Sequence, residues 1–350
     1  MTRPADRGAV TRLARLQPLL VVAAAAGVVV LLWLHGPDWG AVGHALASMS
    51  WSWALAAVGL NFASAIVRGL AWRTVVVEAV PRPHPRVLDV FSAFFIGVFA
   101  NGVLPGRVGE VARVGVLIRH MPPQRGLWPA LLGSVVAHRL LEILPSIGLI
   151  VWVLAAAKIP GWASTSLLTV VALGVLLLVL GILSARRHEN VDLADAGRVR
   201  AAITRVRQGL GVLRRGRAAL AAAALQSAAW GLQLAAVWAA MRAFHLFLPL
   251  IAAGVVLALM NVALIVPLWP GNVGLQQAAI ALPLVSYGVV YSRGFAYGIG
   301  LQVIESSVGY VFGILFLLRE GIGIVGLKTL VRTGEPRAGA DNAELHENAA

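Results

Sequence analysis

Long apolar runs dominate the sequence and restrict it to a membrane fold. An apolar run of about 17 residues or more is long enough to cross the hydrocarbon core of a bilayer as a helix. Six runs of this kind are predicted as spanning helices: 18–34, 52–77, 127–157, 162–184, 218–244 and 294–318. Since 59% of the residues are hydrophobic and 13% are charged, the chain cannot also build the polar shell of a soluble domain. We therefore expect an all-α polytopic membrane protein.

Two further apolar stretches are interrupted near their middle. Residues 90–118 contain the pair Pro105-Gly106, and residues 250–289 contain the pair Pro270-Gly271. Proline and glycine both break helices, so neither stretch is predicted to form one continuous helix. We expect two re-entrant broken segments in addition to the six spans or, alternatively, eight shorter spans in all.

The basic residues orient these segments. The chain carries 29 Lys and Arg against 15 Asp and Glu, a net charge of +14, and cytoplasmic loops of membrane proteins concentrate Lys and Arg. Cationic segments at both ends and in the middle place the two termini in the cytoplasm and the protein in the cell membrane. The expected organisation is a basic cytoplasmic N-terminus, a first membrane half, a cytoplasmic amphipathic basic segment, a second membrane half and a partly disordered cytoplasmic tail: 1–17, 18–184, 185–217, 218–318 and 319–350.

The basic segment 185–217 alternates arginines with aliphatic residues at helical spacing. Such a helix suits the surface of an anionic inner leaflet. It has no aromatic residues for stacking on bases, so we expect no nucleic acid partner.

The two breaks share a motif. Residues 105–109 and 270–274 both read P-G-x-V-G. The predicted topology around the first break is out-to-in, re-entrant, in-to-out, and around the second it is reversed. Inverted repeats with helices broken at corresponding positions indicate a binding site near the bilayer midplane. The sequence therefore predicts an inverted repeat with its site between the two breaks.

A proline-glycine break suits a helix start inside the membrane, where free backbone N–H groups attract an anion. Two arginines beside such a start would suit a phosphate. The candidate headgroup residues are Asn101, Pro105, Gly106, Arg107, Gly109, Glu110, Arg113, Pro270, Gly271 and Gly274. In the alternative interpretation, Arg107 and Arg113 only sit at the cytoplasmic interface and Glu110 is their structural partner.

Ionisable residues also fall within predicted spans, where charge is costly and usually functional. These intramembrane polar candidates are His138, Arg139, Glu142 and Glu305. The two glutamates are interpreted either as proton-coupling carboxylates or as structural counter-ions of arginines. Arg68, near the inner end of its span, either belongs with them or only reaches toward the interface.

The sequence has no pattern typical of an enzyme. It contains no cysteine, no phosphate-binding P-loop and no histidine spacing that suits a metal. We expect no metal, no cofactor and no enzymatic activity.

The first break resembles a family signature. Asn101-Gly-Val-Leu-Pro-Gly-Arg-Val-Gly-Glu-Val-Ala-Arg113 is similar to the N-x-x-LPGRxGE-x-x-R motif of the lysylphosphatidylglycerol synthase transmembrane (flippase-like) family, the membrane half of the multiple peptide resistance factor. His138-Arg-Leu-Leu-Glu142 and Pro267-Leu-Trp-Pro-Gly-Asn-Val-Gly-Leu-Gln-Gln277 resemble two further family motifs, E-R-x-x-D and P-x-x-PGGxG-x-x-E. His138, Asn272 and Gln277 depart from these patterns, so no carboxylate role carries over to position 277.

The resemblance implies a flippase-like protein that binds and translocates an anionic or aminoacylated phospholipid or a polyprenyl-phosphate-linked lipid. Its expected partners are membrane lipids. Only 32 residues follow Leu318, so we expect no synthase domain and no lysyl transfer by this chain. Two alternatives stay open: a non-transporting membrane partner of a lipid- or glycan-modifying enzyme, and an integral-membrane transferase that uses lipid-linked donors.

Overall fold

The computed structural model describes residues 37–80, 82–104, 108–124, 126–157, 159–186, 216–264, 272–323 and 326–327. All regular secondary structure within these ranges is helical, which confirms the all-α prediction. The predicted span 18–34, the cytoplasmic N-terminus, most of the basic segment 185–217 and most of the tail lie outside the described residues.

Among the described residues, five helices are long and apolar enough to cross a membrane. They are α3 (Trp51–Ala79), α6 (Leu127–Ala156), α7 (Gly161–Arg186), α9 (Gly216–Ala243) and α12 (Tyr291–Arg319). Helices of 26 to 30 residues measure about 39–45 Å at 1.5 Å per residue, which exceeds the hydrocarbon thickness. Five predicted spans are thus confirmed to within a few residues at each end.

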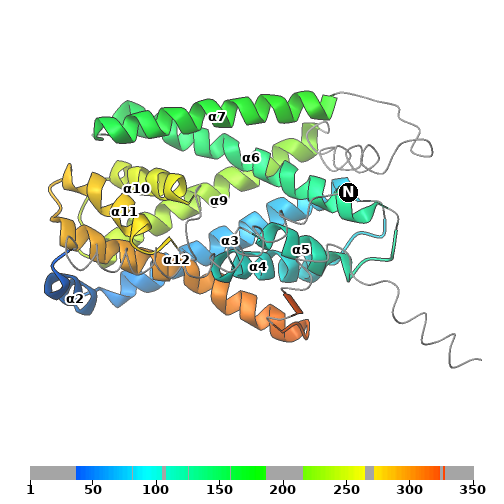
Figure 1. Ribbon diagram of the computed structural model, residues 1–350, viewed down its shortest axis with the longest axis horizontal. Coiled ribbons are helices and arrows are strands. Elements are labelled where there is room, and N and C mark those ends of the chain that lie inside the picture. Colours follow the sequence, from blue (N-terminus) through cyan, green and yellow to red (C-terminus); the bar gives the residue numbers. More distant parts are fainter. Residues whose placement is uncertain are drawn as a thin grey trace, which may run out of the picture.

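Each interrupted stretch forms two shorter helices. The first gives α4 (Val87–Val103) and α5 (Gly109–Ile118), and the second gives α10 (Leu250–Ala263) and α11 (Leu275–Val285). Figure 1 shows α4 and α5 toward one end of the long axis, where α3 and α12 terminate, and α10 and α11 toward the opposite end. Each broken segment therefore occupies its own half of the molecule, as expected for re-entrant pairs.

Helix packing follows an approximate twofold exchange between the two halves. The exchange pairs α3 with α9, α4 with α10, α5 with α11 and α6 with α12. It turns the contact between α4 and α12 into the contact between α10 and α6. The other contacts among these eight helices map onto one another in the same way. The exchange partners α3 and α9 pack along one another. They run in opposite directions, as the hydrogen bond from the Ser50 N–H at the start of α3 to the Ala243 carbonyl at the end of α9 shows (2.8 Å). This arrangement is that of an inverted repeat.

A short helix, α2 (Trp39–Ala47), lies between the predicted spans 18–34 and 52–77, where no span is expected. Asp38 caps it, since one carboxylate oxygen accepts from the N–H groups of Gly40 and Ala41 at 2.9 and 3.1 Å. The Asp38 N–H donates to Ser292 Oγ at 2.9 Å, which fixes α2 against the start of α12. Nine residues are too short for a clear periodic signal, so the apolar pattern did not predict this helix.

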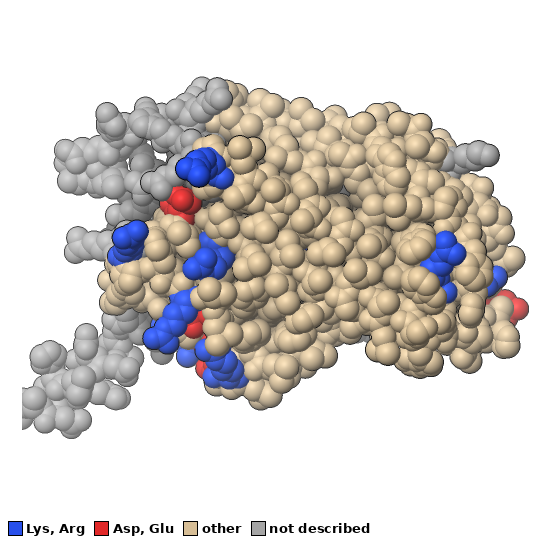
Figure 2. Space-filling view, turned by 180° about the vertical axis from the view of Figure 1, so that it is seen from behind, with Lys and Arg blue, Asp and Glu red and all other residues tan. Residues whose placement is uncertain are grey.

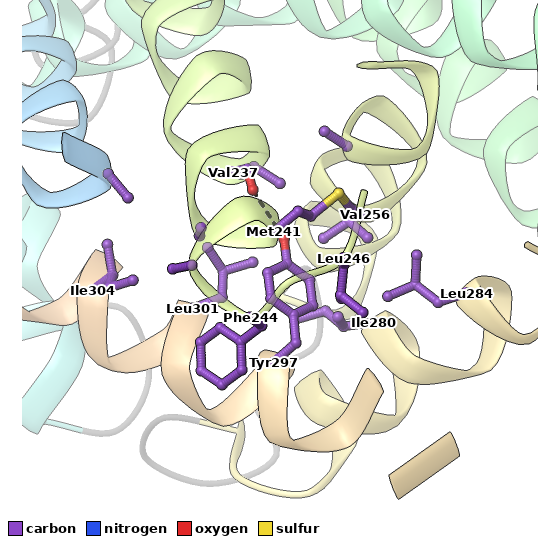
Figure 3. Packing of buried hydrophobic residues seen from close by; sticks show 14 of the residues in the cluster. Val237, Met241, Phe244, Leu246, Val256, Ile280, Leu284, Tyr297, Leu301 and Ile304 are labelled. Atoms are coloured by element: carbon purple, nitrogen blue, oxygen red, sulfur yellow. Dashed lines mark hydrogen bonds between the residues drawn. The ribbon is translucent and has the colours of Figure 1, made fainter. Parts of the chain in front are cut away.

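The largest apolar core joins α9, α10, α11 and α12 around one buried tyrosine. Figure 3 shows the Tyr297 ring between side chains from these helices, with its hydroxyl pointing to α9. That hydroxyl donates to the Val237 carbonyl at 3.1 Å, so the polar end of the ring is satisfied inside an apolar cluster. The cluster makes the second half a rigid support for the part of α12 that lines the cavity described below.

Helix α7 contrasts with this core. Only 6% of its most apolar window is buried, and its buried side chains include Ala163 and Leu167. Its main packing partners among the described helices are α6 and α10 (Figure 1). An apolar helix exposed along most of its surface is stable only against lipid. Trp51, Trp53, Trp152 and Trp162, near the ends of α3, α6 and α7, are likewise exposed.

Candidate functional site

A cavity of about 320 Å³ lies at the centre of the helix bundle, between the two halves. Its ionisable lining residues come from α3, α5, α6 and α12: Arg68, Glu110, Arg113, His138, Arg139, Glu142 and Glu305. Asn61, Asn101, Gln233 and Asn261 add uncharged polar groups. All four predicted intramembrane polar residues line it, and so do four of the predicted headgroup residues, Asn101, Gly109, Glu110 and Arg113.

Five of the lining residues form one chain of ion pairs. Arg68 Nη1 lies 2.9 Å from Glu142 Oε1, and Arg139 Nη1 lies 2.6 Å from Glu142 Oε2. Arg139 also pairs with Glu110, and Glu110 pairs with Arg113. The order is therefore Arg68, Glu142, Arg139, Glu110, Arg113, which alternates in sign. The chain connects α3, α6 and α5 through charge-assisted hydrogen bonds.

Arg113 is the buried end of this chain. Its side chain is 5% exposed, and its guanidinium carbon lies 4.8 Å from the ring centroid of Trp72, within range of a cation–π contact. Glu110 contacts Nη2 of the guanidinium, and the Nε and Nη2 atoms are buried without a hydrogen-bond partner among the described residues. Glu110 and Trp72 therefore hold the guanidinium at the wall of the cavity.

Arg139 is the accessible cation of the chain. Its side chain is 51% exposed, against 25% for Arg68. The Arg139 guanidinium contacts the carboxylates of both Glu110 and Glu142. Arginine can do this because its planar group presents five N–H donors in a rigid fork. A ligand anion that enters the cavity can therefore reach Arg139 while Glu110 and Glu142 hold it in position.

Helix α5 begins directly after the first break, where its backbone lies unusually close to the backbone of α4. Asn101 Oδ1 accepts from the Gly109 N–H at 2.8 Å, so the amide caps the first turn of α5 from the end of α4. A Cβ on Gly97 would lie 2.9 Å from the Gly109 carbonyl oxygen, which leaves no room for a side chain. Pro105, Gly106 and Arg107 lie outside the described residues.

The second break is uncharged. Gly274 has φ of +91°, a conformation that glycine adopts readily, and its N–H donates to Gln277 Oε1 at 2.6 Å. The Gln277 amide in turn donates to Gln302 of α12. Pro270 and Gly271 lie outside the described residues, and Gly274 is absent from the cavity lining. The described part of the second break thus joins helices through neutral amides.

The comparison with protein families gives one match. The model described as "Lysylphosphatidylglycerol synthase TM region" matches residues 19–313, which is most of the chain. The chain belongs to the lysylphosphatidylglycerol synthase transmembrane family. No curated protein and no solved structure matches this family member.

Among the described residues of this family member, Glu305 is the one carboxylate that the second half contributes to the cavity lining. Gln233 Nε2 donates to Glu305 Oε1 at 2.7 Å, and Asn61 Nδ2 donates to the backbone carbonyls of Ile304 and Glu305, both at 3.1 Å. His138 Nε2 lies 3.3 Å from the Arg68 carbonyl oxygen and 3.2 Å from Gln226 Nε2. One ring nitrogen of a neutral imidazole either donates to the carbonyl or accepts from the amide, so each tautomer satisfies one of these contacts.

Several lining residues escaped sequence analysis because they are neutral amides. Asn61, Gln233 and Asn261 sit within apolar helices, where charge-based searches pass over them. Buried amides in a membrane helix need partners, so a search for amides in spans would have found all three. Among the described residues there is no group of three or more His, Asp or Glu that could hold a metal ion.

Proposed function

We propose that this protein binds a lipid with a phosphate-containing headgroup in the central cavity and moves that lipid between the two leaflets. The proposed substrate is an anionic or aminoacylated phospholipid or a polyprenyl-phosphate-linked lipid. The observation that carries the proposal is the half-exposed Arg139 guanidinium inside a cavity between two broken helices. Family membership agrees with an integral membrane protein of this kind.

The chemistry of the cavity supports a phosphate ligand. A guanidinium donates two parallel hydrogen bonds to phosphate oxygens, and Arg139 is already aligned by its two carboxylate partners. The first turn of α5 places the positive end of the helix dipole beside Glu110, although the N–H groups of Gly109, Val111 and Ala112 already donate to Asn101 and to the Val108 carbonyl. A ligand phosphate would share Arg139 with the glutamates, which suits reversible binding.

Transport is tested with purified full-length protein in liposomes that contain acyl-labelled fluorescent phosphatidylglycerol. Reduction of the outer-leaflet label by dithionite reports how fast lipid from the inner leaflet appears outside. We expect wild-type protein to accelerate this movement and Arg139→Gln to remove most of the acceleration. Arg217→Gln, at an exposed arginine at the start of α9, is the matched control and should retain it.

Mass spectrometry of lipids retained by the purified protein identifies the headgroup. Phosphate-containing lipids enriched over the bulk membrane, and lost in Arg139→Gln, are the expected result. Neither retention nor movement of any phospholipid by monodisperse wild-type protein would refute the proposal. If Arg139→Gln left lipid exposure in cells unchanged while an enzyme still co-purified, the non-transporting partner would be the better description.

A transferase role receives less support from the geometry. A general base must be free to accept a proton. Glu110 and Glu142 each contact two arginines, which holds both carboxylates in their ionised form and occupies their oxygens. We expect Glu110→Gln to leave turnover of lipid-linked donors at background level, the same as wild type.

The proposed location is the cell membrane, with both termini in the cytoplasm. Figure 2 shows most of the lysines and arginines that it colours toward one end of the long axis. That end is where α3 and α12 terminate and α9 begins (Figure 1). The positive-inside rule assigns this end to the cytoplasm.

A further inference from the structure

Three carboxylates line the cavity, and their partners differ. Glu110 and Glu142 each pair with two arginines. Glu305 has no ion pair among the described residues, and its side chain accepts one hydrogen bond, from the neutral Gln233 amide at 2.7 Å. An arginine pair keeps a carboxylate charged, whereas an amide can donate to a carboxylate or to the carbonyl oxygen of a neutral acid. Of these three carboxylates, Glu305 is therefore the one that keeps its hydrogen bond whether it is ionised or protonated.

The inverted repeat shows how this difference arises. The same 165-residue spacing separates Gly109 from Gly274 in the two break motifs and Arg68 in α3 from Gln233 in α9. Arg68 contacts Glu142 of α6, and Gln233 contacts Glu305 of α12, the exchange partner of α6. The two contacts thus join corresponding helices of the repeat, although Glu305 lies two residues before Ser307, the position that the same spacing pairs with Glu142. In the second half glutamine replaces arginine at the α9 position, and Glu305 contacts this glutamine without a cation.

The position of Glu305 makes its charge costly. It lies 14 residues from each end of α12, which is about 21 Å at 1.5 Å per residue and corresponds to the bilayer midplane. An ionised carboxylate at this depth is expensive without a cation or water, whereas the neutral acid is much less so.

Few titratable groups face Glu305 from the helices packed against α12. Arg68 of α3 is the cation that shares its side of the cavity, and α9 contributes the neutral Gln233. The lining residues of α4 are not titratable, α11 carries no ionisable residue, and α2 meets α12 at Ser292, thirteen residues earlier. Tyr297, on α12 itself, donates to Val237. The remaining charges across the cavity are the ion-paired Glu110, Arg113, Arg139 and Glu142.

The charges of the cavity sum to zero when Glu305 is ionised. Arg68, Arg113 and Arg139 balance Glu110, Glu142 and Glu305 among the described lining residues, with His138 neutral. Protonation of Glu305 leaves a net charge of +1, which matches the single negative charge of a phosphodiester. An anion that enters a low-dielectric cavity repels an ionised carboxylate and so favours its protonation.

We propose that Glu305 takes up a proton when an anionic phosphodiester lipid occupies the cavity, so that lipid and proton bind and leave together. This proposal rests on the proposed lipid-binding function and adds its coupling ion. The proton comes from water on the side where the lipid enters, adds to a carboxylate oxygen of Glu305, and returns to water where the lipid leaves. No bond of the lipid is broken.

Proton uptake is measured by titration calorimetry of the full-length protein with dioctanoyl phosphatidylglycerol. Parallel runs use buffers of different ionisation enthalpy, because the difference in heat gives the number of protons taken up. Wild-type protein should take up close to one proton per bound lipid, and its affinity should fall by up to about tenfold per pH unit where uptake occurs.

Two variants remove the uptake in opposite ways. Glu305→Gln is permanently neutral, and Gln233→Arg rebuilds the arginine–glutamate pair of the first half, so each cavity carries +1 without a proton. Both should bind the lipid at least as tightly as wild type, with no proton uptake and little pH dependence. Glu78→Gln, at the end of α3 and outside the cavity lining, is the matched control and should retain uptake.

The outcomes separate this proposal from the proposed function. Lipid binding by wild type without proton uptake, or uptake that persists in Glu305→Gln, would overturn the coupling and leave lipid binding intact. Failure of wild type and both variants to bind the lipid would overturn both. Since Gln233→Arg adds a salt bridge rather than removing a group, its result stands even if Glu305→Gln folds poorly.

Discussion

Gly97 of α4 and Gly109 of α5 face each other across the first helix break. A Cβ placed on Gly97 would lie 2.9 Å both from the Gly109 carbonyl oxygen and from the Cβ of Arg113. Real Cβ atoms essentially never approach this closely, so the two helices of the broken segment meet through bare backbone. This contact holds the start of α5, and with it Glu110 and Arg113, against the cavity.

We predict that Gly97→Ala forces α5 away from α4. The cost of the added methyl group is expected to be about 1–3 kcal/mol, because the atoms it meets are backbone and a buried side chain. Unfolding of the detergent-solubilised protein, followed by tryptophan fluorescence, measures it. Gly59→Ala is the control, since a Cβ there meets nothing within 4 Å. Equal stability of the two variants would contradict the close packing.

We predict that Arg113 and Arg139 have separable roles. Arg113→Ala leaves Glu110 without its buried partner and removes the contact with Trp72, at an expected cost of about 3–5 kcal/mol. Arg139→Gln keeps an amide donor beside Glu110 and Glu142, so it should cost less stability than Arg113→Ala and mainly weaken lipid retention. Thermal unfolding and lipid mass spectrometry on the same samples distinguish these effects. Reversed results would make Arg113 the ligand-binding residue.

The absence of cysteine allows a direct topology test. Ser286→Cys, in the exposed turn after α11, should react with a membrane-impermeant maleimide in intact cells, because the proposed orientation places it outside. His84→Cys, in the exposed loop before α4, should react only after the membrane is opened. Labelling in the opposite order would reverse the orientation.

We predict that Glu320 fastens the end of α12 to the first broken segment. Ser92 Oγ of α4 donates to one oxygen of Glu320 at 2.6 Å, and His120 Nε2, after α5, lies 2.8 Å from the other. Glu320→Ala should destabilise the protein by about 1–3 kcal/mol and raise hydrogen exchange in the last turn of α12. Glu320→Gln, which can still accept from Ser92, should show a smaller effect. Unchanged exchange in Glu320→Ala would mean that these contacts do not hold the helix end.

The helices could be predicted from sequence because membrane insertion depends on apolar length and on breakers. The runs 52–77 and 218–244 correspond to α3 and α9, and the Pro-Gly pairs mark the gaps between α4 and α5 and between α10 and α11. Helix α2 was missed because nine half-exposed residues carry no such signal.

Glu110, Arg139 and Glu142 could be chosen as candidates from their residue type. Which of them contact one another could not be predicted from the sequence. Glu142 contacts Arg68, which lies 74 residues earlier, and Glu305 contacts Gln233, which lies 72 residues earlier. These pairings depend on how the two halves pack, and hydropathy does not contain that information. The 165-residue spacing between the two break motifs is visible in the sequence. That the same spacing relates Arg68 of α3 to Gln233 of α9 becomes clear only once the contacts of these two residues are known.

The exposure of α7 has a consequence for the history of the sequence. Apart from positions such as Ala163 and Leu167, its residues need only be apolar and helical, because they face lipid. Natural selection acts weakly on the choice among leucine, valine and isoleucine at such sites. Among related chains, α7 should therefore drift fastest, while the tightly packed crossing of α3 and α9 should change slowly.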